Sequence, residues 1–173
     1  MATGTTFSVK YRRKREQKTN YKKRLNLLKS HSIRLVVRPT NKNILAQLVE
    51  YEADGDKILS HAKSTELAKL GWKYSKSNTP SAYLVGLLCG IRAKEKGVEA
   101  AILDSGLHPH IKGSKIYACV KGLLDAGIAI PIDEEVIPGE DRITGKTIAS
   151  YVKGSDGMEG DFANVKDKIM GSK

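Results

Sequence analysis

Alternating apolar and polar positions near residue 33 predict the first strand of a sheet. Apolar residues at 33, 35 and 37 alternate with Arg34, Val36 and Arg38, and a period of two is typical of a strand with one buried face. A second strand is predicted at 43–51, and Asp54-Gly55 predicts a hairpin into a third strand around 57–63. Three strands joined by short links predict an antiparallel meander.

After the meander, apolar residues recur at helical spacing. A short helix is expected at 65–70, and Asn78-Thr79-Pro80 predicts a longer helix that ends at Gly97, because Asn is a good N-cap and Pro suits the first helical turn. A short buried strand is predicted at 99–104. A second long helix is predicted from Ser114 to Gly127.

Elements in this order predict an α/β fold, an antiparallel meander plus β-α units that form a sandwich with a mixed sheet. The tail contains an acidic stretch at 133–141 and two possible short helices at 147–152 and 161–170. We therefore divide the chain into a basic arm (1–31), an α/β core domain (32–131) and a C-terminal extension (132–173).

Charge is distributed very unevenly along the chain. Of its 30 lysines and arginines, twelve lie within the first 38 residues, which contain only one of the 19 acids. The rest of the chain contains 18 cations and 18 acids, whose charges cancel. The net charge of +11 therefore sits at one end. A polycation gains most from a polyanion, because each neutralised phosphate releases condensed counterions. Nucleic acid is the first partner to consider.

Several protein classes are disfavoured. No apolar leader and no run of eighteen apolar residues is present, so we expect neither a signal peptide nor a membrane span, and a cytosolic location. Cys89 and Cys119 lie far apart within apolar helical patterns without a CxxC motif, which predicts buried free thiols and no zinc site.

Candidate catalytic motifs are incomplete. Gly145-Lys146-Thr147 matches the end of a P-loop, but Glu140 stands where its leading glycine should be. Asp104, Ser105 and His108 lie too close in sequence for a triad assembled from separate elements. His108 and His110 lack a third metal ligand. Asp104 is the one acid well placed for a two-metal nuclease, which needs several converging carboxylates.

The arm has the chemistry of an RNA-binding segment. Its arginines and lysines are interleaved with tyrosines and with short polar residues such as Thr19 and Asn20. Guanidinium groups bind phosphates, rings stack on unpaired bases, and short polar side chains reach 2'-hydroxyls. Residues 8–24 bury too little apolar surface to offset their ordering entropy. We therefore expect the arm to be disordered without RNA.

The sequence resembles the archaeal-type eighteenth large-subunit ribosomal protein family, which is related to the eukaryotic large-subunit ribosomal protein five. The likeness covers about residues 8–154. It departs at Gln17, where a glycine is usual, and at Ile116-Tyr117, which replaces a Val-Phe pair. Residues 141–148 resemble an extension that bacterial members lack. The motifs are KYRRKREQKTNYKKRL (10–25), IRLVVR (33–38), GW (71–72), NTPSAYLVGLL (78–88), LDSGL (103–107), KGSK (112–115), GLLDAG (122–127) and IP (130–131).

This resemblance implies a structural constituent of the large subunit of the cytoplasmic ribosome. It implies binding to 5S rRNA, attachment of that RNA to the large-subunit rRNA in the central protuberance, and contact with neighbouring ribosomal proteins. No cofactor, metal, catalytic residue, small-molecule substrate or membrane partner is implied. The implied rRNA-binding residues are Lys10, Tyr11, Arg12, Arg13, Lys14, Arg15, Lys18, Thr19, Tyr21, Lys22, Arg24, Arg34, Arg38, Lys112, Gly113, Ser114 and Lys115.

Two of these features also follow from the residues themselves. Arg34 and Arg38 share one face of the first strand, so the RNA-binding surface is expected to continue from the arm onto the sheet. Lys112 to Lys115 form a Gly-Ser helix start between two lysines, which suits an anion, with a plain N-cap as the alternative. An RNA-processing enzyme on a similar fold and a basic adaptor outside the ribosome remain the alternatives.

Overall fold

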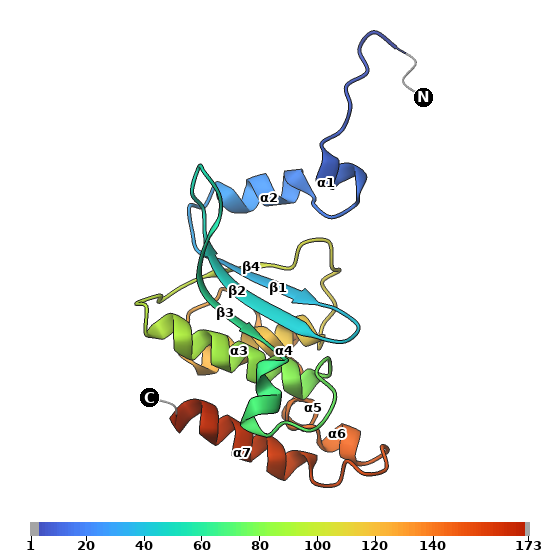
Figure 1. The fold of residues 1–173 in the computed structure, drawn as a ribbon, viewed down its shortest axis with the longest axis vertical. Coiled ribbons are helices and arrows are strands. Elements are labelled where there is room, and N and C mark those ends of the chain that lie inside the picture. The colour runs from blue at the N-terminus through green and yellow to red at the C-terminus, as the bar shows by residue number, and fades with distance from the viewer. Residues whose placement is uncertain (1–3, 172–173) are drawn as a thin grey trace.

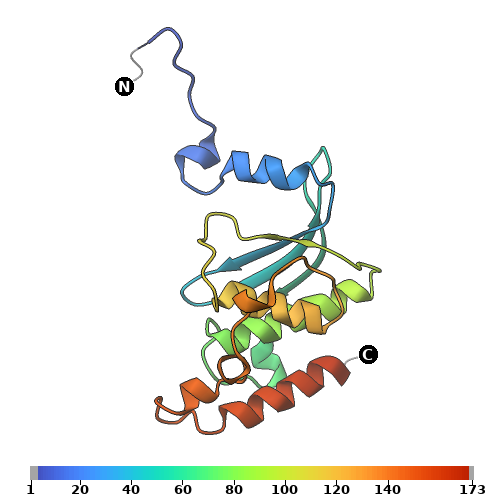
Figure 2. The same ribbon diagram turned by 180° about the vertical axis from the view of Figure 1, so that it is seen from behind.

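A computed structural model describes residues 4–171 of the chain. At its centre is a four-stranded sheet in the order β3-β2-β1-β4. Helices α3 (Thr79–Lys94) and α4 (Lys115–Asp125) cover one face of the sheet. Helices α1 (Arg12–Arg15) and α2 (Tyr21–Leu28) lie on its other side (Figure 1), and the reverse view in Figure 2 shows the same layers.

The sheet is mixed. Strands β1 (Arg34–Pro39), β2 (Ile44–Glu50) and β3 (Lys57–Lys63) form an antiparallel meander, and β4 (Ile102–Asp104) runs parallel to β1. The inner face buries Leu35 and Val37 of β1 against the helices. The predicted α/β fold with its meander and mixed sheet is confirmed. The first three strands lie within about one residue of their predicted bounds, whereas the strand predicted at 99–104 is limited to β4 at 102–104.

Helix α3 is the centre of the core. The Asn78 side chain accepts a hydrogen bond from the Ser81 amide at 2.9 Å, so the predicted N-cap is confirmed. Twelve of its sixteen residues are buried, because the sheet, α4 and the C-terminal segment pack on different sides of the helix. Cys89 in α3 and Cys119 in α4 are buried free thiols, as predicted. Burial raises the pKa of both, that of Cys89 to about 11.

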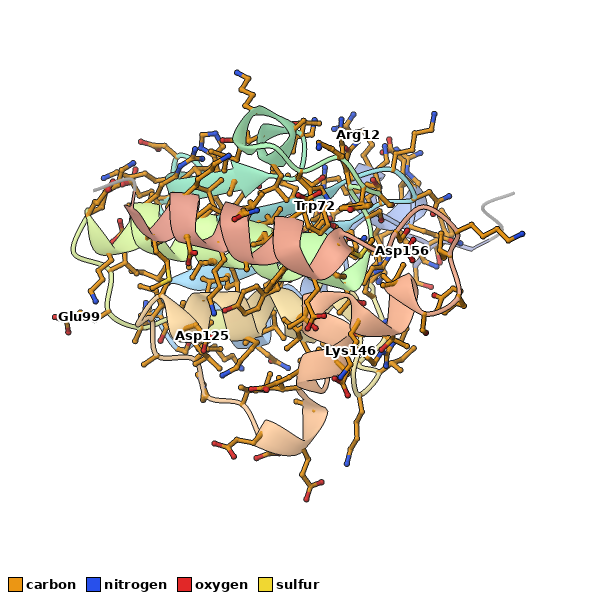
Figure 3. All side chains as sticks on the ribbon, turned by 90° about the horizontal axis from the view of Figure 1, so that it is seen from below. Arg12, Trp72, Glu99, Asp125, Lys146 and Asp156 are labelled. Carbon is orange, nitrogen blue, oxygen red and sulfur yellow. The ribbon has the colours of Figure 1, made fainter. Side chains whose placement is uncertain are left out.

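The C-terminal segment adds a third layer. Helix α7 (Met158–Gly171) crosses in front of α3 when viewed from below (Figure 3). Its buried residues Met158, Phe162, Val165 and Ile169 recur at helical spacing and join the main core. Because this apolar stripe begins three residues before Asp161, the helix is longer than the sequence analysis predicted.

The remaining elements are short. η1 (Glu66–Leu70) ends at Gly71, as predicted. α6 (Lys146–Ala149) is shorter than the helix predicted at 147–152. The acidic stretch contains η2 (Glu134–Val136) and the first residues of α5 (Glu140–Thr144), neither of which was predicted. In α5 only Ile143 is buried, so the hydrophobic pattern was too short to identify a helix.

Candidate nucleic-acid interface

Helix α2 of the basic arm lies against the outer side of the sheet. Asn20 begins α2, and its Oδ1 accepts a hydrogen bond from the Lys23 amide at 3.1 Å. Gln17, in the turn between α1 and α2, has a φ of +52°, in the left-handed region that favours glycine. This backbone explains why glycine is usual at this position in the resembled family. In the structure residues 12–15 and 21–28 are helical, and the disorder of the arm without RNA stays a prediction.

Two sets of contacts hold α2 in place. Arg24 Nη2 lies 2.8 Å from both carboxylate oxygens of Asp56, in the turn before β3. Lys23 Nζ donates to Ser105 Oγ at 3.1 Å and to Gly106 O at 3.3 Å, in the loop after β4. These partners are remote in sequence, so no local pattern in the arm reveals them.

Arginines and aspartates alternate in a chain of ion pairs beneath the arm. Asp56 Oδ2 also accepts from Arg34 Nη2 at 2.8 Å. Arg34 Nη1 reaches Asp104 Oδ2 at 3.0 Å, and Arg38 Nη2 reaches Asp104 Oδ1 at 3.2 Å. The order Arg24–Asp56–Arg34–Asp104–Arg38 links α2, the β2–β3 turn, β1 and β4. Three cations against two anions leave this ion-pair chain with one net positive charge.

Strand register explains why Asp104 meets two arginines. Asp104 is paired with Val36 in the parallel β1–β4 ladder. Arg34 and Arg38 lie two residues to either side of Val36 and on the same face, so both are diagonal neighbours of the carboxylate. The sequence analysis treated Asp104 as a possible metal ligand and overlooked Asp56 and Lys23. The sequence contained one signal for this contact: Asp104 ends a predicted strand, and another predicted strand carries two arginines four residues apart.

Arg34 and Arg38 have different environments. The Arg38 side chain is 38% exposed, whereas that of Arg34 is 1% exposed. Both were expected to face RNA from the sheet. In the structure only Arg38 reaches the surface, and Arg34 holds the carboxylates that position Arg24 and Arg38.

Asp56 is ionised at neutral pH. Partial burial raises its pKa, but hydrogen bonds and charges from Arg24 and Arg34 lower it by more, so the pKa lies below its ordinary value of 3.8. A carboxylate with a depressed pKa stabilises the fold above its ordinary pKa, and this stabilisation is lost as pH falls through the folded-state pKa. The contact between Asp56 and the arm is therefore complete at neutral pH and is lost only in acid.

Replacing Asp56 with asparagine is expected to loosen α2 at neutral pH. The variant loses the charge that holds Arg24, and such a partly exposed pair contributes about 1 kcal/mol, or about fivefold in an opening equilibrium. Hydrogen exchange followed by mass spectrometry is expected to show about fivefold faster exchange within residues 21–28. Exchange within α3 is expected to stay slow.

Glu52→Gln is the matched control for this experiment. Glu52 lies in the same turn region and pairs with Lys57 at 3.4 Å, and its side chain is 52% exposed. No hydrogen bond or ion pair joins it to the arm among residues 4–171. This variant is expected to leave exchange in α2 unchanged. Equal protection of α2 in Asp56→Asn and wild-type protein would show that Asp56 does not hold the arm.

The loop before α4 offers fewer free donors than predicted. Gly113 N donates to Val136 O at 2.9 Å, and Ser114 N donates to Ile111 O at 3.2 Å, so both amides are already bonded within the chain. Lys112 Nζ pairs with Glu135 at 3.0 Å, and Lys115 Nζ lies 3.2 Å from Ser77 Oγ. Because Lys112 is 69% exposed, it remains accessible to an anion.

A polar cluster connects this loop to the arm. Lys23 Nζ lies 3.0 Å from His110 Nε2, and His110 Nδ1 lies 3.0 Å from Tyr117 Oη. An ammonium group can only donate, so Nε2 accepts and the imidazole proton resides on Nδ1. Ser105 is fully buried, and the imidazole beside its Oγ is that of His110, at 3.2 Å, rather than that of His108.

The other candidate motifs are explained by packing. Gly145 lies between α5 and α6 with a φ of +88°, and a Cβ there would overlap the thioether of Met158. It is thus a packing junction rather than part of a phosphate loop. Among residues 4–171 no three His, Cys, Asp or Glu side chains are grouped closely enough to hold a metal ion. No helix in this part of the chain is long and apolar enough to cross a membrane.

The structure is a small α/β domain with a cationic arm on one side of its sheet. Aromatic and short polar residues lie among the cations of the arm, and these are the features of an RNA-binding protein. Residues 5–98 match the family described as ribosomal large subunit proteins 60S L5 and 50S L18. The chain is also 50% identical over 153 residues to the large ribosomal subunit protein uL18 of Korarchaeum cryptofilum (strain OPF8), covering 88% of this chain and 78% of that protein. The chain belongs to this family.

Membership in the family decides between the alternatives left by the sequence. The chain is a structural component of the large subunit of the cytoplasmic ribosome, with rRNA and ribosomal proteins as its partners, and it is not an enzyme. The resemblance described from its motifs is confirmed. The RNA-processing enzyme and the adaptor outside the ribosome are therefore set aside.

Proposed function

We propose that this chain binds 5S rRNA and helps to attach it to the large-subunit rRNA in the central protuberance, beside other ribosomal proteins. The observation that carries the proposal is the position of the arm. Residues 10–18 are all exposed and contain six cations against the single acid Glu16, while α2 fixes them to one side of the sheet. A preordered cationic surface on a rigid scaffold loses less entropy on binding RNA than a free tail does.

The residues of the arm take complementary roles in this proposal. Cationic side chains bind phosphates and set the register on RNA, and the two tyrosines stack on unpaired bases. Arg38 extends the surface onto β1, and the loop at 112–115 contributes Lys112 and Lys115. The proposed contacts are Lys10, Tyr11, Arg12, Arg13, Lys14, Arg15, Lys18, Thr19, Tyr21, Lys22, Arg24, Arg38, Lys112, Gly113, Ser114 and Lys115, with Arg34 acting beneath them.

Binding of the purified protein to cognate 5S rRNA over a salt series tests the proposal. Contact with roughly six to ten phosphates gives a slope of log K against log salt of about −5 to −8. Replacing Arg12, Arg13, Lys14 and Arg15 with alanine is expected to flatten that slope by about 3, because each lost phosphate contact contributes about 0.7 to 0.9. A chain lacking residues 1–24 is expected to lose more affinity.

A variant of equal charge provides the control. Lys63, Lys69, Lys73 and Lys153 are exposed and lie outside the arm, and their joint replacement with alanine is expected to leave the slope nearly unchanged. A length-matched duplex RNA serves as the competing ligand. Equal and equally salt-sensitive binding to both RNAs would mean that the arm is a generic polycation, and the proposed role with 5S rRNA would then be abandoned.

A further inference from the structure

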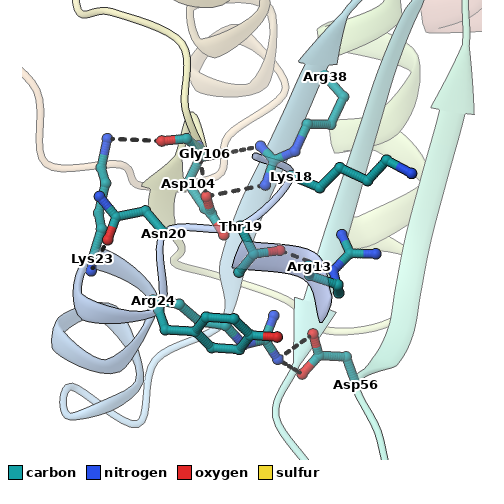
Figure 4. Close-up of a pocket in the computed structure, with 11 residues that line it drawn as sticks. Arg13, Lys18, Thr19, Asn20, Lys23, Arg24, Arg38, Asp56, Asp104 and Gly106 are labelled. Atoms are coloured by element: carbon teal, nitrogen blue, oxygen red, sulfur yellow. Dashed lines mark hydrogen bonds and ion pairs between the residues drawn. The ribbon is translucent and has the colours of Figure 1, made fainter. Parts of the chain in front are cut away.

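A cavity of about 470 Å³ lies between the arm and the sheet (Figure 4). Its walls come from α1 and the turn after it, from the start of α2, from the β2–β3 turn and from the ends of β1 and β4, and they include Arg13, Asn20, Tyr21 and Arg38. Sites that bind small ligands have volumes of about 300 to 1,000 Å³. The cavity is therefore large enough for one small organic group and is part of the surface on which the proposed function rests.

The charge of the cavity favours an anion. Five cations line it against two acids, Asp56 and Asp104. Each acid is already shared between two arginines of the ion-pair chain, with Arg34 as the common partner of both. Arg13 uses its Nε to bind Thr19 Oγ1 at 2.8 Å, and its two terminal nitrogens have no acceptor among residues 4–171. These nitrogens remain available to a ligand.

The start of α2 supplies backbone donors beside the cavity. The Tyr21 and Lys22 amides begin α2 and have no acceptor within the described part of the chain, whereas the Lys23 amide is capped by Asn20. Of the first two residues, Tyr21 lines the cavity. Free amides at a helix start favour an anion. Together with Arg13, they are matched to the oxygens of a phosphate group.

An aromatic ring completes the wall. Tyr21 is only partly buried, and its ring centroid lies 5.2 Å from that of Tyr11 at an interplanar angle of 53°. A partly exposed ring offers a stacking surface to a nucleobase. The side chain of Asn20 also lines the cavity: its Oδ1 accepts from the Lys23 amide (Figure 4), and its NH₂ group has no acceptor among residues 4–171.

A phosphate donor set, a stacking ring and a cavity for one small group together match a nucleotide. We propose that this cavity takes up a single unpaired nucleotide of the bound RNA, with its phosphate at Arg13 and the start of α2 and its base against Tyr21. The inference rests on the proposed function, because the nucleotide belongs to an RNA that the arm already binds. A base held in this way must be unstacked from its neighbours, so the site selects a loop or bulge rather than a duplex.

Two variants test the site with cognate 5S rRNA and full-length protein. Tyr21→Ala removes the stacking ring, and Thr19→Phe fills the cavity without changing charge. Stacking of one base is typically worth about fivefold to one-hundredfold in affinity, so each variant is expected to bind more weakly within that range. Tyr21→Phe keeps the ring and is expected to bind as wild type does. Tyr151→Ala, which removes an exposed tyrosine from the C-terminal segment, is the control.

Chemical probing of the RNA bases locates the nucleotide. Wild-type protein is expected to change the dimethyl sulfate or carbodiimide reactivity of one unpaired base, and Tyr21→Ala and Thr19→Phe are expected to abolish that change. If both variants bind 5S rRNA with wild-type affinity and footprint, the inference is wrong while the proposed function stands. If wild-type protein shows no preference for 5S rRNA, the proposed function fails and the inference fails with it.

Free mononucleotides distinguish the source of the ligand. Adenosine and uridine 5'-monophosphate are titrated against the protein without RNA. Binding weaker than millimolar is expected, because the cavity is open and a single nucleotide makes no contact with the arm outside it. Micromolar binding of either compound that is lost in Thr19→Phe would identify a site for free nucleotides and would overturn the inference.

Discussion

Replacement of Asp104 with alanine is expected to lower the free energy of unfolding by about 3 to 5 kcal/mol, because it removes one of the two carboxylates that pair with a buried guanidinium. The Arg34 side chain is 1% exposed, and its Nε has no acceptor within residues 4–171. Loss of Asp104 leaves Arg34 with Asp56 alone. Urea denaturation followed by circular dichroism measures the change.

Two comparisons identify the cause of this loss. Asp133→Ala removes an exposed acid and is expected to change stability by less than about 0.5 kcal/mol. The double variant Arg34→Met with Asp104→Leu is expected to recover part of the loss, because apolar residues of similar volume can replace a buried ion pair. A change below about 1 kcal/mol for Asp104→Ala would contradict a buried ion-pair chain.

Replacement of Gly122 with alanine is expected to destabilise the protein by about 3 kcal/mol or more, at the upper end of what overpacking costs. A Cβ at Gly122 of α4 would overlap Tyr83 O and lie 2.7 Å from Leu87 N, both in the backbone of α3. Gly86 of α3 faces the Cys119 backbone in the same way. Since backbone atoms cannot rotate aside, the two helices would have to separate.

Gly160→Ala is the matched control for the helix crossing. A Cβ at Gly160 in α7 meets no atom within 4 Å. Alanine there is expected to stabilise the helix by up to about 1 kcal/mol, because alanine is the better helix former. Thermal unfolding of the three proteins checks the order. A Gly122→Ala protein as stable as wild type would show that α3 and α4 do not cross at this separation.

The regular elements of the core were predictable from the sequence because their signals are local. The strand at 57–63 was predicted with the bounds that the structure shows, and the long helix after Asn78 begins at its predicted cap. A period-two pattern, a capping residue and a turn dipeptide each act within a few residues. Family membership was likewise predictable, since its motifs are local strings of residues.

Errors occurred where the stabilising partner is remote in sequence. The contacts of the arm were not predicted, because they are made with Asp56 and Ser105, which lie far from residues 8–24 in sequence. Arg34 was predicted to face RNA because it shares one face of the first strand with Arg38, yet the arm and the β2–β3 turn cover Arg34. Helix α5 was not predicted, because it buries only one residue and so shows no hydrophobic periodicity.

The sequence by itself determined the fold class, the strands and main helices, the position of the charge and the family of this protein. These properties depend on periodicity, capping and composition, which can be recognised within short segments of the sequence. Only the tertiary structure decided which charges meet: it paired Asp104 with Arg34 and Arg38 and formed the open cavity beside Tyr21. Ion pairs and cavities form between residues that folding brings together, so they depend on strand register and on docking of the arm.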